Sequence, residues 1–325
     1  MKVLITGITG LLGHQVGRSC HETGHTVVGL YRRSEMNLNL DYPIEWRYQD
    51  LRDEFFEEDL LDEIDAVIHC AADTRMGSGI NQNQDALNVF AVAKLVDLGV
   101  TQKLSRFILI SSSNTFEIGT KEKPGNEKSP LERSEKLFNY ANSKIAAEMI
   151  CRHAAKERGL HTVILNPTFM IGPSDSPSIS SNKLIHYILR NKTIPKLNGS
   201  KNFVDLRDVS DACVAALSKG RRGENYILSN QLVTFEDLVN RVKSLQGTTA
   251  TMIPIPDGLV KISGRVSSFF ESAFRKPFNF NYKTAQLLLS TPYFSNAKAK
   301  KHLGFNPRPI DDTLKELVEE YKGRQ

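Results

Sequence analysis

The segment that most constrains the fold of this chain is TGITGLLG, Thr6 to Gly13. It follows a short apolar, β-branched run and precedes a helical pattern, so it predicts a strand, a tight turn and a helix in succession. Glycines at positions 7, 10 and 13 let the backbone approach a ligand closely, and the first turn of a helix offers N–H groups to an anion. The alternative is a glycine-rich turn that only packs a helix on a strand. We interpret the segment as the pyrophosphate-binding turn of a dinucleotide fold.

Short apolar runs alternate with longer helical patterns through the first half of the chain. This alternation predicts an α/β fold, a Rossmann-type doubly wound parallel sheet with helices on both faces. The rhythm changes after Pro167, and the chain reads as mostly helical from Thr234 onward. We therefore predict a nucleotide-binding domain at 1–168 with a return segment at about 201–230, and a smaller substrate-binding domain at 169–200 and 231–325. The expected strands are 2–6, 26–30, 44–48, 66–70, 106–111 and 162–165, and the expected early helices are 11–23, 53–61, 84–98 and 140–158.

Composition excludes several classes of protein. The formal net charge is +5, and no dense basic run interleaved with aromatic residues occurs, so we expect no nucleic-acid partner. The four cysteines lie far apart and form no CxxC, so we expect neither a disulfide framework nor a metal site. No segment holds about eighteen apolar residues together, so we expect no membrane partner and a cytoplasmic location.

The end of the second expected strand carries positive charge. In dinucleotide folds an acid at this place binds the 2′-hydroxyl of NAD, whereas an arginine accommodates the 2′-phosphate of NADP. Here Tyr31 takes the place of the acid, and Arg32 and Arg33 follow it. A guanidinium matches the geometry of a phosphate, so we predict NADP(H) as the preferred cofactor, with NAD(H) as the alternative. Two solvated surface arginines are the other interpretation.

The segment YANSK pairs Tyr140 with Lys144 on a predicted helix. Residues at i and i+4 share a helix face, and an ammonium beside a phenol stabilises the phenolate and lowers its pKa. Such a tyrosine can exchange a proton near neutral pH. Upstream, FILISSSNTF (107–116) places serines at the carboxyl end of a strand, where doubly wound sheets bind ligands. The alternative is an incidental Tyr and Lys on a surface helix.

Together these motifs resemble the extended short-chain dehydrogenase/reductase family, also described as the NAD-dependent epimerase/dehydratase superfamily. The resemblance covers nearly the whole chain. It rests on TGxxGxxG at 6–13, QDLRD at 49–53, VIHCAA at 67–72, LNV at 87–89, the serine run, YxxxK, NPTFMIGP at 166–173 and FVDLRDVSDA at 203–212. The chain departs from the family pattern at Asn166, where an arginine is usual, and at TFEIG (115–119), where TVYG is common.

The resemblance implies roles for single residues. Ser113 would hydrogen-bond the substrate, Tyr140 would exchange the proton, Lys144 would hold the nicotinamide ribose and tune Tyr140, and Asn88 would support the proton relay. Ser113 is preferred to Ser111 and Ser112 by alignment. Asp50 and Leu51 would flank adenine, and Pro167 would meet the nicotinamide. The full set implied for the cofactor is Gly7, Thr9, Gly10, Leu11, Leu12, Gly13, Arg32, Arg33, Asp50, Leu51, Ala71, Ala72, Tyr140, Lys144 and Pro167.

Residues 220–239 and 296–321 are similar to the dihydroflavonol 4-reductase-like branch of that family. The resemblance implies NADPH-dependent reduction of a ketone or aldehyde in a small substrate. The aromatic-rich stretch at 266–282 is a candidate lining for an apolar substrate pocket, and packing within the small domain is the other interpretation. Dehydration of a sugar is not expected, because Asn114 and Thr115 stand where dehydratases carry acids. A nucleotide-sugar epimerase is the alternative enzyme, and a non-catalytic NADP-sensing regulator is the third interpretation. The family also implies a homodimer built on the helices at 84–98 and 140–158, with Val89, Val92, Leu95, Ile145, Met149 and Ile150 as the candidate interface residues.

Overall fold

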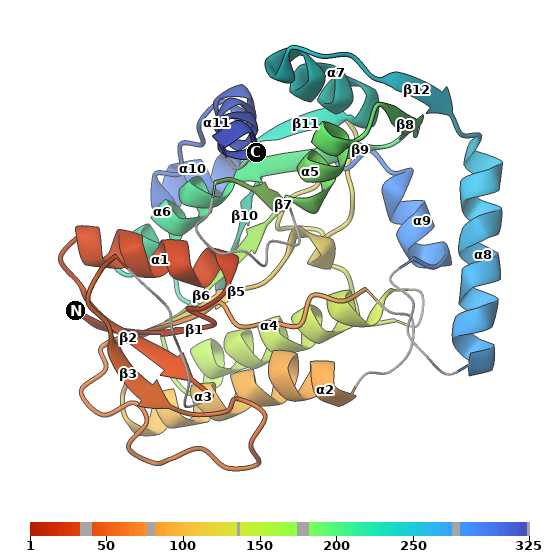
Figure 1. Cartoon of the computed structure of the whole chain (residues 1–325). Coiled ribbons are helices and arrows are strands. Elements are labelled where there is room, and N and C mark those ends of the chain that lie inside the picture. Colours follow the sequence, from red (N-terminus) through yellow and green to blue (C-terminus); the bar gives the residue numbers. More distant parts are fainter. Residues whose placement is uncertain (33–40, 77–81, 135–136, 174–181, 275–279, 324–325) are drawn as a thin grey trace.

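A computed structural model shows the fold of the chain and describes residues 1–32, 41–76, 82–134, 137–173, 182–274 and 280–323. Its centre is a seven-stranded sheet in which every pairing is parallel (Figure 1). This confirms the predicted doubly wound α/β class. Across the sheet the strands are β10 (Glu224–Leu228), β6 (Thr162–Pro167), β5 (Arg106–Ile110), β4 (Ala66–His69), β1 (Lys2–Thr6), β2 (Thr26–Tyr31) and β3 (Glu45–Tyr48).

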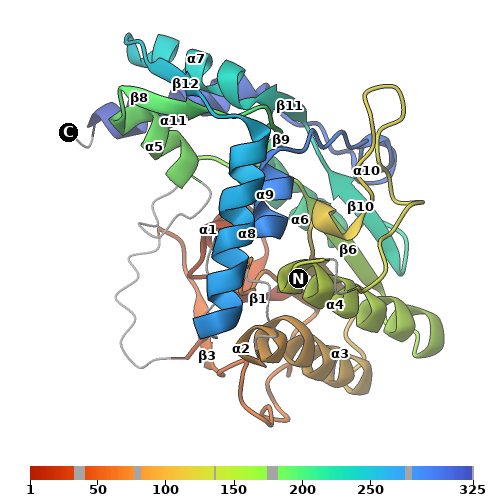
Figure 2. The same ribbon diagram turned by 90° about the vertical axis from the view of Figure 1, so that its right-hand side faces the viewer.

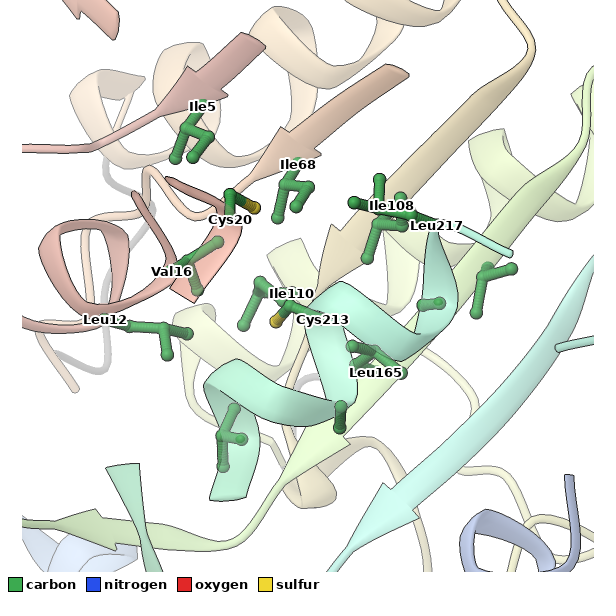
Figure 3. Close-up of a cluster of buried hydrophobic side chains, with 14 of the residues drawn as sticks. Ile5, Leu12, Val16, Cys20, Ile68, Ile108, Ile110, Leu165, Cys213 and Leu217 are labelled. Carbon is green, nitrogen blue, oxygen red and sulfur yellow. The ribbon is translucent and has the colours of Figure 1, made fainter. Parts of the chain in front are cut away.

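Helices cover both faces of this sheet. One face is covered by α1 (Leu11–Glu22), α6 (Leu206–Ala216) and α10 (Ala297–Leu303). Figure 3 shows how side chains of α1, such as Val16, meet Ile5 and Ile68 of the sheet within this layer. The opposite face is covered by α3 (Ala91–Thr101) and α4 (Asn139–Glu157). A short helix, α2 (Gln82–Asp85), and a π-helical turn at Ala86–Phe90 lead into α3.

The remaining elements form a smaller region above and to the right of the sheet in Figure 1. Its three-stranded sheet consists of β11 (Gln231–Thr234), β9 (Ser200–Asp205) and β7 (Phe169–Ile171), and β12 (Thr251–Pro254) pairs with β8 (Thr193–Lys196). The expected return segment is thus split, because β9 pairs in the small sheet and β10 pairs in the large one. The division into two domains stays a prediction. The helices here are α5 (Lys183–Arg190), α7 (Phe235–Gln246), α8 (Asp257–Phe274), α9 (Tyr282–Leu288) and α11 (Ile310–Gly323). Among the described residues, no helix combines the length and the apolar composition that crossing a bilayer requires.

The helix expected at 53–61 is wrong, because the segment forms turns instead. Arg47 holds it in that form: its guanidinium donates to the carbonyl oxygens of Asp59, Leu60 and Asp62 at 3.3, 2.7 and 2.9 Å. The run DEFFEEDLLDE also places like charges three and four residues apart, which destabilises an isolated helix.

Gly13, in the first turn of α1, lies against the backbone of the turn that follows β1. A Cβ atom built on Gly13 would stand 2.1 Å from the carbonyl oxygen of Gly7, and that oxygen belongs to the backbone of the tight turn. We expect Gly13→Ala to lower the free energy of unfolding by about 3 kcal/mol, because the turn or the helix must shift. Denaturant unfolding measures this loss.

Gly258→Ala is the matched control, since its added methyl group meets nothing within 4 Å. The control should leave stability unchanged within about 0.5 kcal/mol. Equal stability of the Gly13 variant and the control would contradict the close approach.

Candidate active site

A pocket of about 940 Å³ opens at the carboxyl ends of β1, β2 and β4. The strand order reverses direction between β1 and β4, and open parallel sheets bind ligands at such a point. Its volume suits a cofactor of dinucleotide size. The pocket is lined by Gly7, Thr9, Gly10, Leu30, Tyr31, Arg32, Gln49, Asp50, Leu51, Arg52, Cys70, Ala71, Ala72, Asp73, Thr74, Arg75, Asn83 and Leu87.

The structure brings together many of the predicted cofactor residues and leaves others outside the lining. Gly7, Thr9, Gly10, Arg32, Asp50, Leu51, Ala71 and Ala72 all line the pocket. Leu11, Leu12 and Gly13 form the first turn of α1, where Leu12 is buried in the core of the sheet. Tyr140, Lys144 and Pro167 belong to α4 and β6. Arg33 lies outside the described residues. The roles of all these residues in binding stay predictions.

At the floor of the pocket the backbone at Gly7 and the backbone at Ala71 lie so close together that no side chain fits between them. Gly7 has a φ of +66°, and a Cβ atom there would lie 2.7 Å from the backbone nitrogen of Ala71. The Thr6 hydroxyl accepts a hydrogen bond from that nitrogen at 3.2 Å and hydrogen-bonds with Nδ1 of His69 at 2.9 Å. Burial lowers the pKa of His69 to about 3, so its imidazole is neutral at pH 7. These contacts tie the ends of β1 and β4 together directly beneath the pocket.

The pocket fits the pyrophosphate of a dinucleotide. The N-terminus of α1 carries no acidic residue in its first turn, and its N-cap is Gly10, which adds no side chain between the helix dipole and the pocket. Free N–H groups at such a helix end bind phosphate. The glycine turn therefore leaves space for a phosphate group beside the N-terminus of α1, and its binding of a pyrophosphate stays a prediction.

The charged residues on the pocket lining are mostly paired. Arg52 donates to both oxygens of Asp50, and this hydrogen bonding lowers the pKa of Asp50 to about 2. Arg75 forms the same kind of pair with Asp73. Arg32 is exposed at the end of β2, where its charge also lowers the pKa of Asp50. Sequence reasoning missed Arg52, Asp73 and Arg75, although Arg52 stands inside the QDLRD motif.

Tyr140 and Lys144 are both buried in the first turns of α4. The Lys144 ammonium lies 5.9 Å from the centroid of the Tyr140 ring and donates to the carbonyl oxygen of Ile110 at 2.8 Å. Burial raises the pKa of Tyr140 to about 12, although a hydrogen bond with Ser112 lowers it. The expected lowering of the Tyr140 pKa by Lys144 is therefore wrong. The cost of burying a phenolate outweighs an ammonium that stands over the ring rather than beside the hydroxyl.

Burial also lowers the pKa of Lys144 to about 8. This value is below the ordinary 10.5 but above neutrality. At pH 7 most molecules therefore carry a neutral phenol at Tyr140 and an ammonium at Lys144, a pair that is ready to donate a proton.

The serine beside Tyr140 stands one residue before the expected one. Ser112 hydrogen-bonds with the Tyr140 side chain, and its hydroxyl accepts from the backbone nitrogen of Asn114 at 3.2 Å. Ser113 is buried and begins a single 3₁₀ turn at Ser113–Thr115. The catalytic role of Ser113 stays a prediction, and Ser112 joins it as a candidate.

Asn88 connects the pocket to α4. It is buried in the π-helical turn, where its Oδ1 accepts from the backbone nitrogen of Asp73 at 2.8 Å. Its Nδ2 donates to the Asp73 carbonyl at 2.9 Å and to the Ser143 hydroxyl at 3.0 Å. Ser143 in turn donates to the backbone carbonyl of Tyr140 at 2.8 Å. π-Helical turns often mark functional sites. Here the turn places the Asn88 side chain so that it bonds both to Asp73 on the pocket lining and to Ser143 on α4, the helix that carries Tyr140.

A buried carboxylate lies directly behind the serine run. Oε1 of Glu148 accepts from the hydroxyls of Ser111 and Thr115 at 2.5 and 2.9 Å. It also accepts from Nδ2 of Asn166 at 2.6 Å, and the same amide nitrogen donates to the Ser112 carbonyl at 3.1 Å. These bonds fix the backbone that carries the candidate serines.

Asn166 occupies the place where the family pattern has an arginine. The positive charge comes instead from α4, where Arg152 donates to Oε2 of Glu148 at 3.0 Å and to Oδ1 of Asn225 at 2.8 Å. The Asn225 amide closes the ring of contacts by donating to Oδ1 of Asn166 at 3.0 Å. The cation beside Glu148 is thus Arg152, one turn farther along α4, and not a residue at position 166 of β6.

Comparison with known proteins identifies the family. Residues 3–229 match the model of the NAD dependent epimerase/dehydratase family, to which the chain therefore belongs. This confirms the resemblance to the extended short-chain dehydrogenases/reductases, whose members include epimerases, dehydratases and reductases.

Two relatives and one solved structure illustrate the match. "Sterol demethylase protein B" of Methylococcus capsulatus is 26% identical over 100% of this chain and 99% of its own length. "Putative dihydroflavonol 4-reductase" of Synechocystis sp. is 25% identical over 97% of this chain and 92% of its own length. A UDP-glucuronic acid 4-epimerase from Bacillus cereus, solved with UDP-glucuronic acid and NAD, has a TM-score of 0.77 at 21% identity and covers 100% of both chains. At that identity the likeness shows the fold alone.

Removing the buried carboxylate of Glu148 should destabilise the protein. We expect Glu148→Ala to lower the free energy of unfolding by about 3 kcal/mol, because Arg152 and three hydrogen-bond donors lose their acceptor in the interior. Chemical denaturation measures the change. The matched control is Glu157→Ala, which removes a half-exposed carboxylate from the same helix and should cost less than about 1 kcal/mol. A Glu148 variant as stable as the control would show that the buried contacts contribute little.

Proposed function

We propose that this member of the NAD dependent epimerase/dehydratase family is an oxidoreductase that reduces the ketone or aldehyde group of a small, apolar substrate with NADPH. The observation that carries the proposal is the site at the carboxyl edge of the sheet. Tyr140, Lys144 and a serine hydroxyl stand together near a pocket that fits a dinucleotide. The name of the Synechocystis relative, which contains dihydroflavonol 4-reductase, supports this assignment.

The residues of the chain would handle the proton. A bound nicotinamide cofactor supplies the hydride. Tyr140, whose raised pKa of about 12 keeps its phenol protonated, would donate its proton to the alkoxide oxygen that forms. The Ser112 hydroxyl, which already hydrogen-bonds Tyr140, would hold the carbonyl oxygen in place. The Lys144 ammonium would stabilise the phenolate that remains after proton transfer.

Dehydration of a sugar does not suit this site. The acid chemistry that it requires is missing at Asn114 and Thr115. Thr115 is buried and donates to the Ser112 carbonyl at 2.8 Å, so it serves the loop rather than a substrate. Glu117 is exposed farther along the chain. Simple carbonyl reduction needs none of these groups.

An apolar substrate agrees with the surroundings of Tyr140. Phe138 stacks against the Tyr140 ring with 6.5 Å between centroids and an interplanar angle of 3°. Met76, Leu137 and Leu287 pack against the same cluster. Such a wall favours hydrocarbon over sugar hydroxyls. The word sterol in the name of the Methylococcus relative fits this preference.

The second candidate function is nucleotide-sugar epimerisation, which the description of the matching NAD dependent epimerase/dehydratase family also names. The two functions differ in their redox balance. Net consumption of NADPH with a carbonyl substrate supports reduction, whereas interconversion of nucleotide sugars without net consumption supports epimerisation.

We also propose a homodimer in which α3 and α4 of each copy meet. Of the residues first considered for this interface, Val92, Leu95 and Ile145 are buried in the protomer itself. Val89 and Ile150 are half-buried and Met149 is 56% exposed, so Met149 is the most accessible of the six. Phe90, 59% exposed, is an additional candidate that the sequence did not single out.

NADPH should bind more tightly than NADH, because Arg32 would pair with the 2′-phosphate. Thermal shift with each cofactor measures the difference, since a ligand stabilises the folded state with the logarithm of its saturation. We expect Arg32→Ala to weaken NADPH binding by about tenfold and to leave NADH binding nearly unchanged. Arg222→Ala removes the same charge at another exposed position and should change neither cofactor. Equal shifts for the two cofactors in the unmodified protein would refute the NADPH preference.

Loss of the Tyr140 hydroxyl should abolish the proton step without loss of the cofactor. We expect Tyr140→Phe to retain the NADPH-induced thermal shift and to lower turnover by roughly 10²-fold or more, followed by NADPH absorbance against a panel of carbonyl compounds. Ser112→Ala should lower turnover more than Ser113→Ala, because Ser112 is the serine hydrogen-bonded to Tyr140. Near-normal turnover of the Tyr140 variant would rule out this mechanism, and the reverse order of the serine variants would return the role to Ser113.

A further inference from the structure

The helix α8 carries a row of exposed apolar side chains. Leu259, Ile262, Val266 and Phe269 are 57%, 53%, 50% and 69% exposed, respectively. They follow one another at spacings of three, four and three residues, so they lie along one side of the helix. We call this set the α8 stripe. Figure 1 shows α8 at the outer edge of the molecule, and Figure 2 shows it lying across the face turned to the viewer.

The opposite side of α8 is held firmly against α9. Val260 is buried, and a Cβ atom on Gly264 would lie 2.9 Å from the Cβ of Ala285. The backbone nitrogen of Tyr282 donates to the Ser268 hydroxyl at 3.0 Å. This packing fixes the rotation of α8 about its own axis. The α8 stripe therefore faces outward because of the fold.

Basic residues border the stripe on one side. Lys261 and Arg265 are exposed on the adjoining side of α8, one turn apart, and Arg265 also stands over the Tyr282 ring at 4.9 Å. An outward apolar face with a basic border is the pattern of helices that lie in the headgroup region of a bilayer. The apolar side chains enter the acyl boundary there, and the cations meet anionic lipid.

The stripe also lies near the candidate active site. The helix α9, on which α8 packs, supplies Leu287 to the apolar cluster around Tyr140. Lys283 of α9 donates to the carbonyl oxygen of Leu137 in the same cluster at 2.8 Å. A surface that receives α8 would therefore lie close to the apolar wall of the site.

We propose that α8 docks this protein on the surface of an anionic phospholipid membrane through Leu259, Ile262, Val266 and Phe269, with Lys261 and Arg265 contacting lipid phosphates. This contact goes beyond the proposed function and does not depend on it. It also departs from the expectation of no membrane partner, because the apolar residues of a surface helix are spaced along one face and form no continuous run. The helix lies on the bilayer and does not cross it.

A second copy of the chain fits the stripe less well. A stable contact between proteins buries about 800 Å² per partner, whereas the stripe is one helix wide and borders two cations. An antiparallel two-fold contact through the stripe would bring the basic borders of both copies together. An anionic bilayer accepts the same features without that repulsion.

Co-sedimentation of the full chain with vesicles tests the proposal. We expect binding to vesicles of phosphatidylcholine with phosphatidylglycerol, weaker binding to phosphatidylcholine alone, and release at high salt. Ile262→Glu/Val266→Glu should lower the bound fraction by at least about tenfold, and Lys261→Gln should lower the affinity for the anionic vesicles about fivefold. The matched control, Phe55→Glu/Tyr187→Glu, introduces the same charges at exposed apolar positions outside α8 and should bind like the unmodified protein.

Thermal melts of all variants establish that they are folded. Failure of the unmodified protein to bind the anionic vesicles would overturn the proposal, and so would equal loss of binding in the control. Self-association that Ile262→Glu/Val266→Glu abolishes, seen by light scattering without vesicle binding, would assign the stripe to a second copy instead. Because none of these measurements uses substrate or cofactor, their outcome is separate from that of the proposed reductase activity.

Discussion

The close approach of three backbone segments, at Gly7, Gly13 and Ala71, is the constraint on which the rest of this structure depends. Their separations leave no room for a single added methyl group. Because α1 can come this near to β1, its N-terminus points into the pocket and its apolar side packs on the sheet. The bonds from Thr6 to His69 and Ala71 then join the next strand to the same point. The position of the pocket and the packing of α1 on the sheet thus both depend on the close approach of these three backbone segments.

The chemistry of the site depends on a second feature, the burial of charge along one helix. Lys144 and Glu148 follow each other by one turn of α4, and both side chains are almost fully buried. Each is held by groups from the carboxyl ends of the central strands: the Ile110 carbonyl for Lys144, and Ser111 and Asn166 for Glu148. Desolvation makes the Lys144 ammonium more acidic and the Tyr140 phenol less acidic. The raised pKa of Tyr140 thereby keeps a proton on the phenol at neutral pH.

The sequence predicted those features that arise from local patterns. The strands, the glycine turn and the pairing of Tyr140 with Lys144 follow from periodicity and spacing alone. Features that depend on tertiary contacts were not predictable in this way. The turns at 53–61 form because Arg47, in the preceding strand β3, donates to their carbonyl oxygens across the turn. Whether Ser112 or Ser113 meets Tyr140 depends on the 3₁₀ turn that follows β5, and the source of the cation beside Glu148 became evident only from the packing of α4.

The π-helical turn at Ala86–Phe90 has a consequence for how this protein could have changed over time. It contains one residue more than a continuous α-helix would need, and each residue rotates the chain by about 100° around the helix axis. Deleting that residue would restore a regular ladder. It would also turn Gln84 and Asn88 relative to Val92 and Leu95, so the polar contacts to Asp73 and the packing on the sheet could no longer coexist. The extra residue therefore sets the rotation between the residues that contact Asp73 and the residues that pack on the sheet. A homologue that retains both sets of contacts must retain the extra residue.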